Sequence, residues 1–120
     1  MILPAKHRLK IWKGATLHYK FTYADGNYQN GITKDLTGYK GRMIIKDEPD
    51  GNILITLNSS NNGVKINGPE GTIELFISSN PADNPNTSNI NWKSAFYELL
   101  LDNGQQTEAV LYGQISVSSY

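Results

Sequence analysis

The stretch Asp35-Leu36-Thr37-Gly38-Tyr39, which runs into Lys40 to Lys46, decides the fold class of this chain. Short polar side chains such as Asp and Thr hydrogen-bond to nearby backbone and favour turns, and Gly38 tolerates the change of chain direction. Beyond the turn the side chains alternate with a period of two, which predicts a strand with one apolar and one charged face. The apolar face comprises Tyr39, Gly41, Met43 and Ile45, and Leu36 is expected in the core beside Tyr39 and Met43.

The same alternation recurs along the chain, between turns rich in Gly, Asn, Asp and Pro. The predicted strands are 7–12, 16–23, 40–46, 53–57, 64–66, 72–78, 92–102 and 107–118. Asn103-Gly104 is a strong hairpin signal, since a type I′ turn requires positive φ at both central residues. The pattern predicts an all-β sandwich or barrel. About eight strands in 120 residues suit two packed sheets, so we expect an antiparallel β-sandwich of about seven to nine strands.

The length of 120 residues suits one domain of this kind. We expect residues 1–6 to form a flexible N-terminal arm and residues 7–120 to form a single β-sandwich domain. Residues 79–91 stand apart because they are rich in Asn, Ser and Pro. A polar connection of this length is either a functional or mobile loop or a crossover between two sheets.

Charge and cysteine content exclude several classes of function. The chain carries 11 basic and 11 acidic side chains, so its formal net charge is zero. A neutral chain without a basic cluster argues against nucleic acid or an anionic membrane as a partner. The absence of cysteine excludes disulfides, thiolate metal sites and cysteine nucleophiles. No stretch approaches the roughly 20 apolar residues of a membrane helix.

No pattern of side chains predicts catalysis, and we expect no catalytic residue, cofactor or metal site. The two histidines, His7 and His18, do not define a site by themselves, and the sequence contains no nucleophile elbow, zincin motif or phosphate-binding loop. The acidic segment 47–50 contains Pro49 and lacks the closing glutamate of a calcium loop, so a solvated turn is preferred. A cross-strand carboxylate pair, as in glycosidases, remains a weaker alternative.

Exposed aromatic and amide side chains are the candidates for surface contacts. Trp12 and Trp92 are expected in or beside the core of so small a domain. Tyr28 lies in a Gly- and Asn-rich loop, and Tyr112 lies opposite the core-facing side chains of its strand. The contact candidates are Tyr28, Asn84, Asn86 and Tyr112.

Six segments together carry a family resemblance. They are KGAT (13–16), Asp25-Gly26, DLTGYKGRMIIK (35–46), GTIELFIS (71–78), FYELLLDNG (96–104) and VLYGQISVS (110–118). In these segments the chain resembles small β-sandwich proteins of tailed bacteriophages and prophages, similar to the immunoglobulin-like N-terminal domain of phage baseplate upper proteins. It departs from that pattern at Glu98, where the family favours aspartate, and in its longer 79–91 connection.

The resemblance implies an immunoglobulin-like sandwich and a non-enzymatic virion structural protein of the tail or baseplate, neck or head. The implied partners are further copies of the chain, in a homo-oligomer, and other virion proteins. The implied location is the virion, after synthesis in the cytoplasm of the bacterial host. The alternative is a β-sandwich module that binds a carbohydrate or a host receptor.

Overall fold

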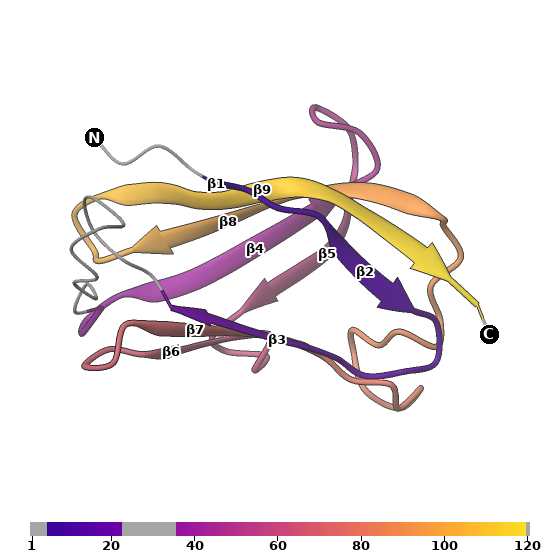
Figure 1. The fold of residues 1–120 in the computed structure, drawn as a ribbon, viewed down its shortest axis with the longest axis horizontal. Coiled ribbons are helices and arrows are strands. Elements are labelled where there is room, and N and C mark those ends of the chain that lie inside the picture. The colour runs from indigo at the N-terminus through magenta and orange to yellow at the C-terminus, as the bar shows by residue number, and fades with distance from the viewer. Residues whose placement is uncertain (1–4, 23–35, 120) are drawn as a thin grey trace.

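The computed structural model describes residues 5–22 and 36–119, which contain nine strands and no helix. The strands form two sheets packed face to face (Figure 1). They are β1 (Ala5–Lys6), β2 (Leu9–Trp12), β3 (Leu17–Thr22), β4 (Lys40–Lys46), β5 (Ile53–Asn58), β6 (Val64–Asn67), β7 (Thr72–Ile77), β8 (Ser94–Asp102) and β9 (Thr107–Ser118).

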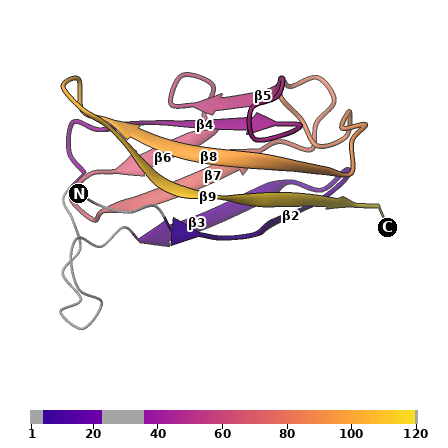
Figure 2. The same cartoon turned by 90° about the horizontal axis from the view of Figure 1, so that it is seen from above.

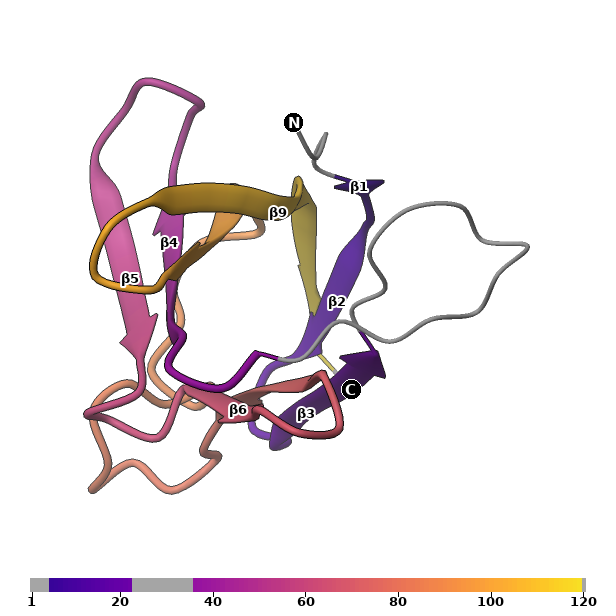
Figure 3. The same ribbon diagram turned by 90° about the vertical axis from the view of Figure 1, so that its left-hand side faces the viewer.

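The large sheet has the strand order β1-β9-β8-β4-β5, and β2 also pairs with β9. The small sheet has the order β3-β7-β6. If β3 to β9 are lettered along the chain as B, C, C′, D, E, F and G, the two sheets have the spatial orders G-F-C-C′ and B-E-D. These are the strand orders of immunoglobulin-like sandwiches. Seen end-on in Figure 3, the large sheet curves so that β9 reaches β2, while β6 and β3 lie across the core. The predicted all-β sandwich is confirmed.

The N-terminal segment differs from the predicted arm. Ala5 and Lys6 pair in parallel with Leu111 and Tyr112 of β9, so the expectation of a free arm over residues 1–6 is wrong for these two residues. Strand β2 continues along β9, also in parallel, as Figure 2 shows. The sandwich is therefore not wholly antiparallel. The physical reason is that the edge of β9 presents backbone groups that the first strands satisfy.

The core-facing register predicted for β4 is confirmed. Gly41, Met43 and Ile45 are buried in alternation with more exposed residues. Leu36 is also buried, and Tyr39 packs partly buried against the same core. A Cβ atom on Gly41 would collide with Val64 of β6. Glycine at this position therefore allows the two sheets to approach each other closely.

A β-bulge changes the pattern in β5. Ile45 pairs with Ile55, but the next residue of β4, Lys46, pairs with Ile53, which leaves Leu54 without a partner in the ladder. Simple alternation would place Ile53 on the same face as Ile55. Instead, the side chain of Ile53 is 58% exposed. A bulge depends on the partner strand, so the local alternation does not reveal it.

Tyr97 of β8 holds the segment between β1 and β2 in place. Its buried hydroxyl donates a hydrogen bond of 2.5 Å to the backbone carbonyl of His7. The His7 N–H donates to the carbonyl of Tyr112 at 2.8 Å. At Gly113, directly beneath this crossing, a Cβ atom would collide with the His7 carbonyl. Burial, with a smaller contribution from nearby Tyr19, raises the pKa of Tyr97 well above its ordinary value.

Truncation of Met43 is expected to destabilise the protein far more than truncation of its neighbours on the charged face. Met43→Ala should lower the free energy of unfolding by about 2–5 kcal/mol, because it opens a cavity in a closed core. Lys40→Ala and Arg42→Ala should each change it by no more than about 0.5 kcal/mol. Urea denaturation of the three variants measures the difference. Equal losses at all three positions would show that the assigned register of β4 is wrong.

Removal of the Tyr97 hydroxyl is expected to lower stability in a pH-dependent manner. At neutral pH, Tyr97→Phe should cost about 1 kcal/mol, because the His7 carbonyl loses its donor. The folded protein keeps Tyr97 neutral to higher pH than the unfolded chain does, so the wild type loses stability as the pH rises above about 10. The variant lacks this loss, and its deficit should shrink. Denaturation curves across this pH range measure it, and a deficit independent of pH would contradict the assignment.

Candidate functional site

The four predicted contact residues do not form one surface. Tyr112 lies on β9 with its side chain 40% exposed on the outer face of the large sheet. Asn84 and Asn86 lie in the connection between β7 and β8, where Asn84 is exposed and Asn86 is buried. Tyr28 lies outside the described residues. The prediction of surface exposure is therefore right for Tyr112 and Asn84 and wrong for Asn86.

Asn86 is buried because its amide holds the connection together. The Nδ2 group donates to the carbonyl of Asp83 at 2.9 Å, and Oδ1 accepts from the N–H of Asn89 at 2.8 Å. Both bonds span three residues, so the side chain closes two turns of backbone around itself. An Asn side chain that bonds to nearby backbone is a common means of stabilising such turns. Asn86 is thus a structural residue of the connection.

The connection 78–93 crosses from the small sheet to the large one and is anchored by hydrogen bonds. The buried hydroxyl of Thr87 donates to the carbonyl of Ala15 at 2.9 Å, which ties the connection to the turn between β2 and β3. The Thr87 N–H donates to the carbonyl of Ser78 at 2.8 Å. The Ser88 hydroxyl donates to the carbonyl of Ser79 at 2.6 Å. Of the two predictions for this segment, the crossover between sheets is confirmed.

A groove of about 460 Å³ lies between this connection and strand β5. One wall is the edge of β5 from residue 54 to residue 56, and the other is the segment from Asn84 to Trp92. Trp92 is half-buried and also packs against the core, as predicted. Among the described residues that line the groove, no side chain is ionisable. We call this feature the amide groove, because five of its lining residues are asparagines: Asn61, Asn84, Asn86, Asn89 and Asn91.

The asparagines of the amide groove divide into two kinds. Asn61 is engaged within the protein: its Nδ2 donates to the carbonyl of Thr56 at 3.0 Å, and its Oδ1 accepts backbone N–H groups. The exposed side chains of Asn84, Asn89 and Asn91 make no hydrogen bond to any described residue. These three amides are therefore available to a ligand. Sequence analysis nominated Asn84 but missed the other two, although both lie in the Asn-rich segment that it singled out.

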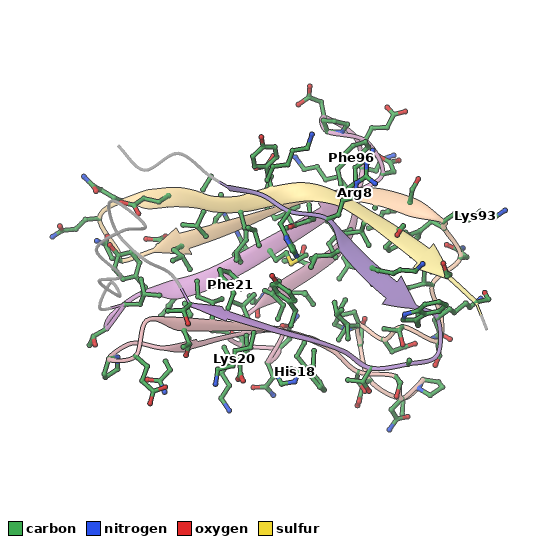
Figure 4. The ribbon with its side chains drawn as sticks, viewed as in Figure 1. Arg8, His18, Lys20, Phe21, Lys93 and Phe96 are labelled. Carbon is green, nitrogen blue, oxygen red and sulfur yellow. The ribbon has the colours of Figure 1, made fainter. Side chains whose placement is uncertain are left out.

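A second surface is the outer face of the large sheet, where apolar side chains alternate with charged ones. One cross-strand row consists of Tyr112, Glu98, Ile44 and Thr56, and the next of Gln114, Phe96, Lys46 and Ile53. Figure 4 shows Phe96 projecting from this face, whereas Phe21 points between the sheets. Ile53 is also strongly exposed on this face. We call these two rows the outer sheet face.

Trp12 is more exposed than expected. Its side chain is 44% exposed rather than packed in the core, and the Lys10 ammonium lies 4.5 Å from the ring centroid. Both residues belong to β2, two positions apart on the same side of the strand. The position of β2 at the margin of the large sheet leaves this side without a covering element.

The ionisable groups singled out in the sequence are spread over the surface. His18 Nε2 lies 3.4 Å from Glu74 Oε1 on the outer side of the small sheet, and Figure 4 shows His18 beside Lys20 there. The ring of His7 packs against Tyr19, with centroids 5.0 Å apart. Asp47 accepts the N–H of Asn52 within its turn. Across residues 5–22 and 36–119 no group of three or more acidic or His side chains is placed to hold a metal ion.

No protein-family model matches the chain, and no curated protein matches it. The resemblance to phage sandwich proteins therefore depends on the six sequence segments alone. In the described part of the chain, no helix is long and apolar enough to cross a membrane.

Substitution of Asn86 is expected to lower stability much more than substitution of Asn84. Asn86→Ala should lower the free energy of unfolding by about 1–3 kcal/mol, because it removes a buried amide whose backbone partners are left unpaired. Asn84→Ala, two residues away and exposed, should change it by at most about 0.5 kcal/mol. Thermal and urea denaturation of both variants provide the comparison. If Asn84→Ala proves as costly as Asn86→Ala, the account of the connection is wrong.

Proposed function

We propose that the protein is a non-enzymatic structural component of a tailed-phage particle, and that it works through protein–protein contacts in a homo-oligomeric assembly. The contact part of the proposal is supported by one observation, the apolar character of the outer sheet face. The phage part is supported by the resemblance in segments 35–46 and 96–104.

The outer sheet face is more apolar than a solvated face requires. An antiparallel sheet with one side in water commonly carries polar side chains on that side. Here large apolar side chains occupy it in neighbouring rows: Tyr112, Ile44, Phe96 and Ile53. Aromatic residues are enriched in protein interfaces, and contiguous exposed apolar patches mark interaction sites. This face is therefore the surface that we assign to assembly.

The occupant that best fits this face is a second copy of the chain. A two-fold interface brings the same patch of both copies together, so the patch must complement itself. Glu98 lies between apolar neighbours in one row, and Lys46 lies in the next row. Face-to-face packing allows Glu98 of each copy to meet Lys46 of the other. The zero net charge of the chain provides little repulsion against this association.

A charge placed on the outer sheet face is expected to abolish self-association. The wild type should sediment as an oligomer, and Tyr112→Asp should sediment as a monomer, because a carboxylate would be desolvated in the interface. Since Glu98 lies directly opposite position 112, a small loss of thermal stability should accompany the substitution. Phe76→Asp is the matched control. Phe76 is 39% exposed against 40% for Tyr112, but it lies on the small sheet, so this variant should still associate.

Sedimentation velocity over a wide concentration range distinguishes the outcomes. A wild type that stays monomeric at high concentration, or equal behaviour of the two Asp variants, would remove the outer sheet face from the proposal. The phage part has a separate test, which is mass spectrometry of purified particles from a host that carries the gene. Absence of the protein from those particles would overturn the virion role and leave the self-association result unaffected.

A further inference from the structure

We propose that the amide groove binds a neutral oligosaccharide. The groove lies between the connection 78–93 and the edge of β5. Its volume of about 460 Å³ falls within the range of about 300–1,000 Å³ found for small-molecule sites. This function is additional to assembly, and the groove shares one residue, Thr56, with the outer sheet face.

The described lining of the groove has no ionisable side chain, and this indicates which net charge a ligand should carry. A charged ligand loses hydration when it enters a groove, and opposite charges or metal ions are the strongest means of offsetting that loss. The lining residues that the structure describes offer amides, one hydroxyl, an indole and apolar groups, and include no Asp, Glu, Lys, Arg or His. The groove therefore favours an uncharged ligand over a phosphorylated, sulfated or sialylated one.

The side-chain amides of Asn84, Asn89 and Asn91 indicate the chemical class of the ligand. A primary amide carries two N–H donors and a carbonyl acceptor, and a sugar hydroxyl both donates and accepts. Asn84, Asn89 and Asn91 can therefore form paired hydrogen bonds with neighbouring hydroxyls of one ligand. All three side chains are exposed on the groove wall and make no bond to described residues. A ligand with many hydroxyl groups matches this arrangement.

Apolar side chains in the same groove complement the other part of a sugar. The C–H groups of a pyranose ring form an apolar surface beside its hydroxyls. Trp92, Pro85 and Leu54 contribute apolar surface next to the asparagines. An indole ring suits this boundary because it combines a large apolar surface with one polar N–H group.

The connection is already held in place before any ligand binds. Thr87 anchors it to Ala15, and Asn86 closes its turns. A preorganised wall lowers the entropy that binding must overcome. The alternative occupant, an extended peptide added to the edge of β5, would need the carbonyl of Thr56, which already accepts a hydrogen bond from Asn61. The geometry therefore favours an oligosaccharide over a peptide.

The test is an NMR titration of the full chain with a panel of neutral oligosaccharides: maltotriose, cellotriose, triacetylchitotriose and lactose. Sialyllactose provides the charged counterpart of lactose. At least one neutral sugar should shift the side-chain amide signals of Asn84, Asn89 and Asn91 and the indole signal of Trp92 in a saturable manner. Sialyllactose should bind no better than lactose.

Exposed asparagines supply variants that keep the fold. Asn84→Ala and Asn89→Ala should each weaken binding about tenfold, through the loss of ligand hydrogen bonds. Asn67→Ala, which removes an exposed amide from β6, is the control and should bind as the wild type does. Unchanged thermal denaturation confirms that the variants are folded.

Four results would overturn the proposal. They are no saturable shift with any neutral sugar at millimolar concentration, stronger binding of sialyllactose than of lactose, binding that both groove variants retain, and shifts along β5 caused only by an extended peptide. Each of these can occur whether or not the protein self-associates, so failure here is distinct from failure of the assembly proposal.

Discussion

The crossing of His7 over Gly113 is the constraint on which the rest of the structure depends. Tyr97 donates to the His7 carbonyl from below, and the missing side chain at Gly113 leaves room for that carbonyl. The crossing aligns β1 and β2 along the edge of β9. It thereby directs the chain toward β3 and closes one side of the core.

The position of β2 has consequences at the far end of the sandwich. The turn after β2 places the carbonyl of Ala15 where the buried hydroxyl of Thr87 can reach it. This bond joins segments that are 72 residues apart and, with the bond from Thr16 to Ser79, anchors the connection that forms the amide groove. The groove therefore depends on the N-terminal pairing, although no residue of β1 or β2 lines it. The outer sheet face depends instead on the pairing of β4 with β5 and β8.

Local alternation predicted the strands well where one face of the strand is apolar and the other is polar. The predicted bounds 40–46 and 107–118 agree with β4 and β9, and Met43 lies in the core. The predictions were weaker where a partner strand intervenes. The bulge at Leu54 turns Ile53 outward, and the short β1 is stabilised by the edge of β9 rather than by a pattern of its own.

The sequence by itself determined the all-β fold, the strand faces and the Asn-rich character of the 79–91 connection, because period-two alternation and turn chemistry are local properties. Only the tertiary structure decided which asparagines are buried structural residues and which are exposed in the amide groove. Asn84 and Asn86 have the same side chain, but one is exposed and the other is buried. Their difference arises from hydrogen bonds and packing that form only when the connection folds against Ala15 and β5, and no sequence pattern records those contacts.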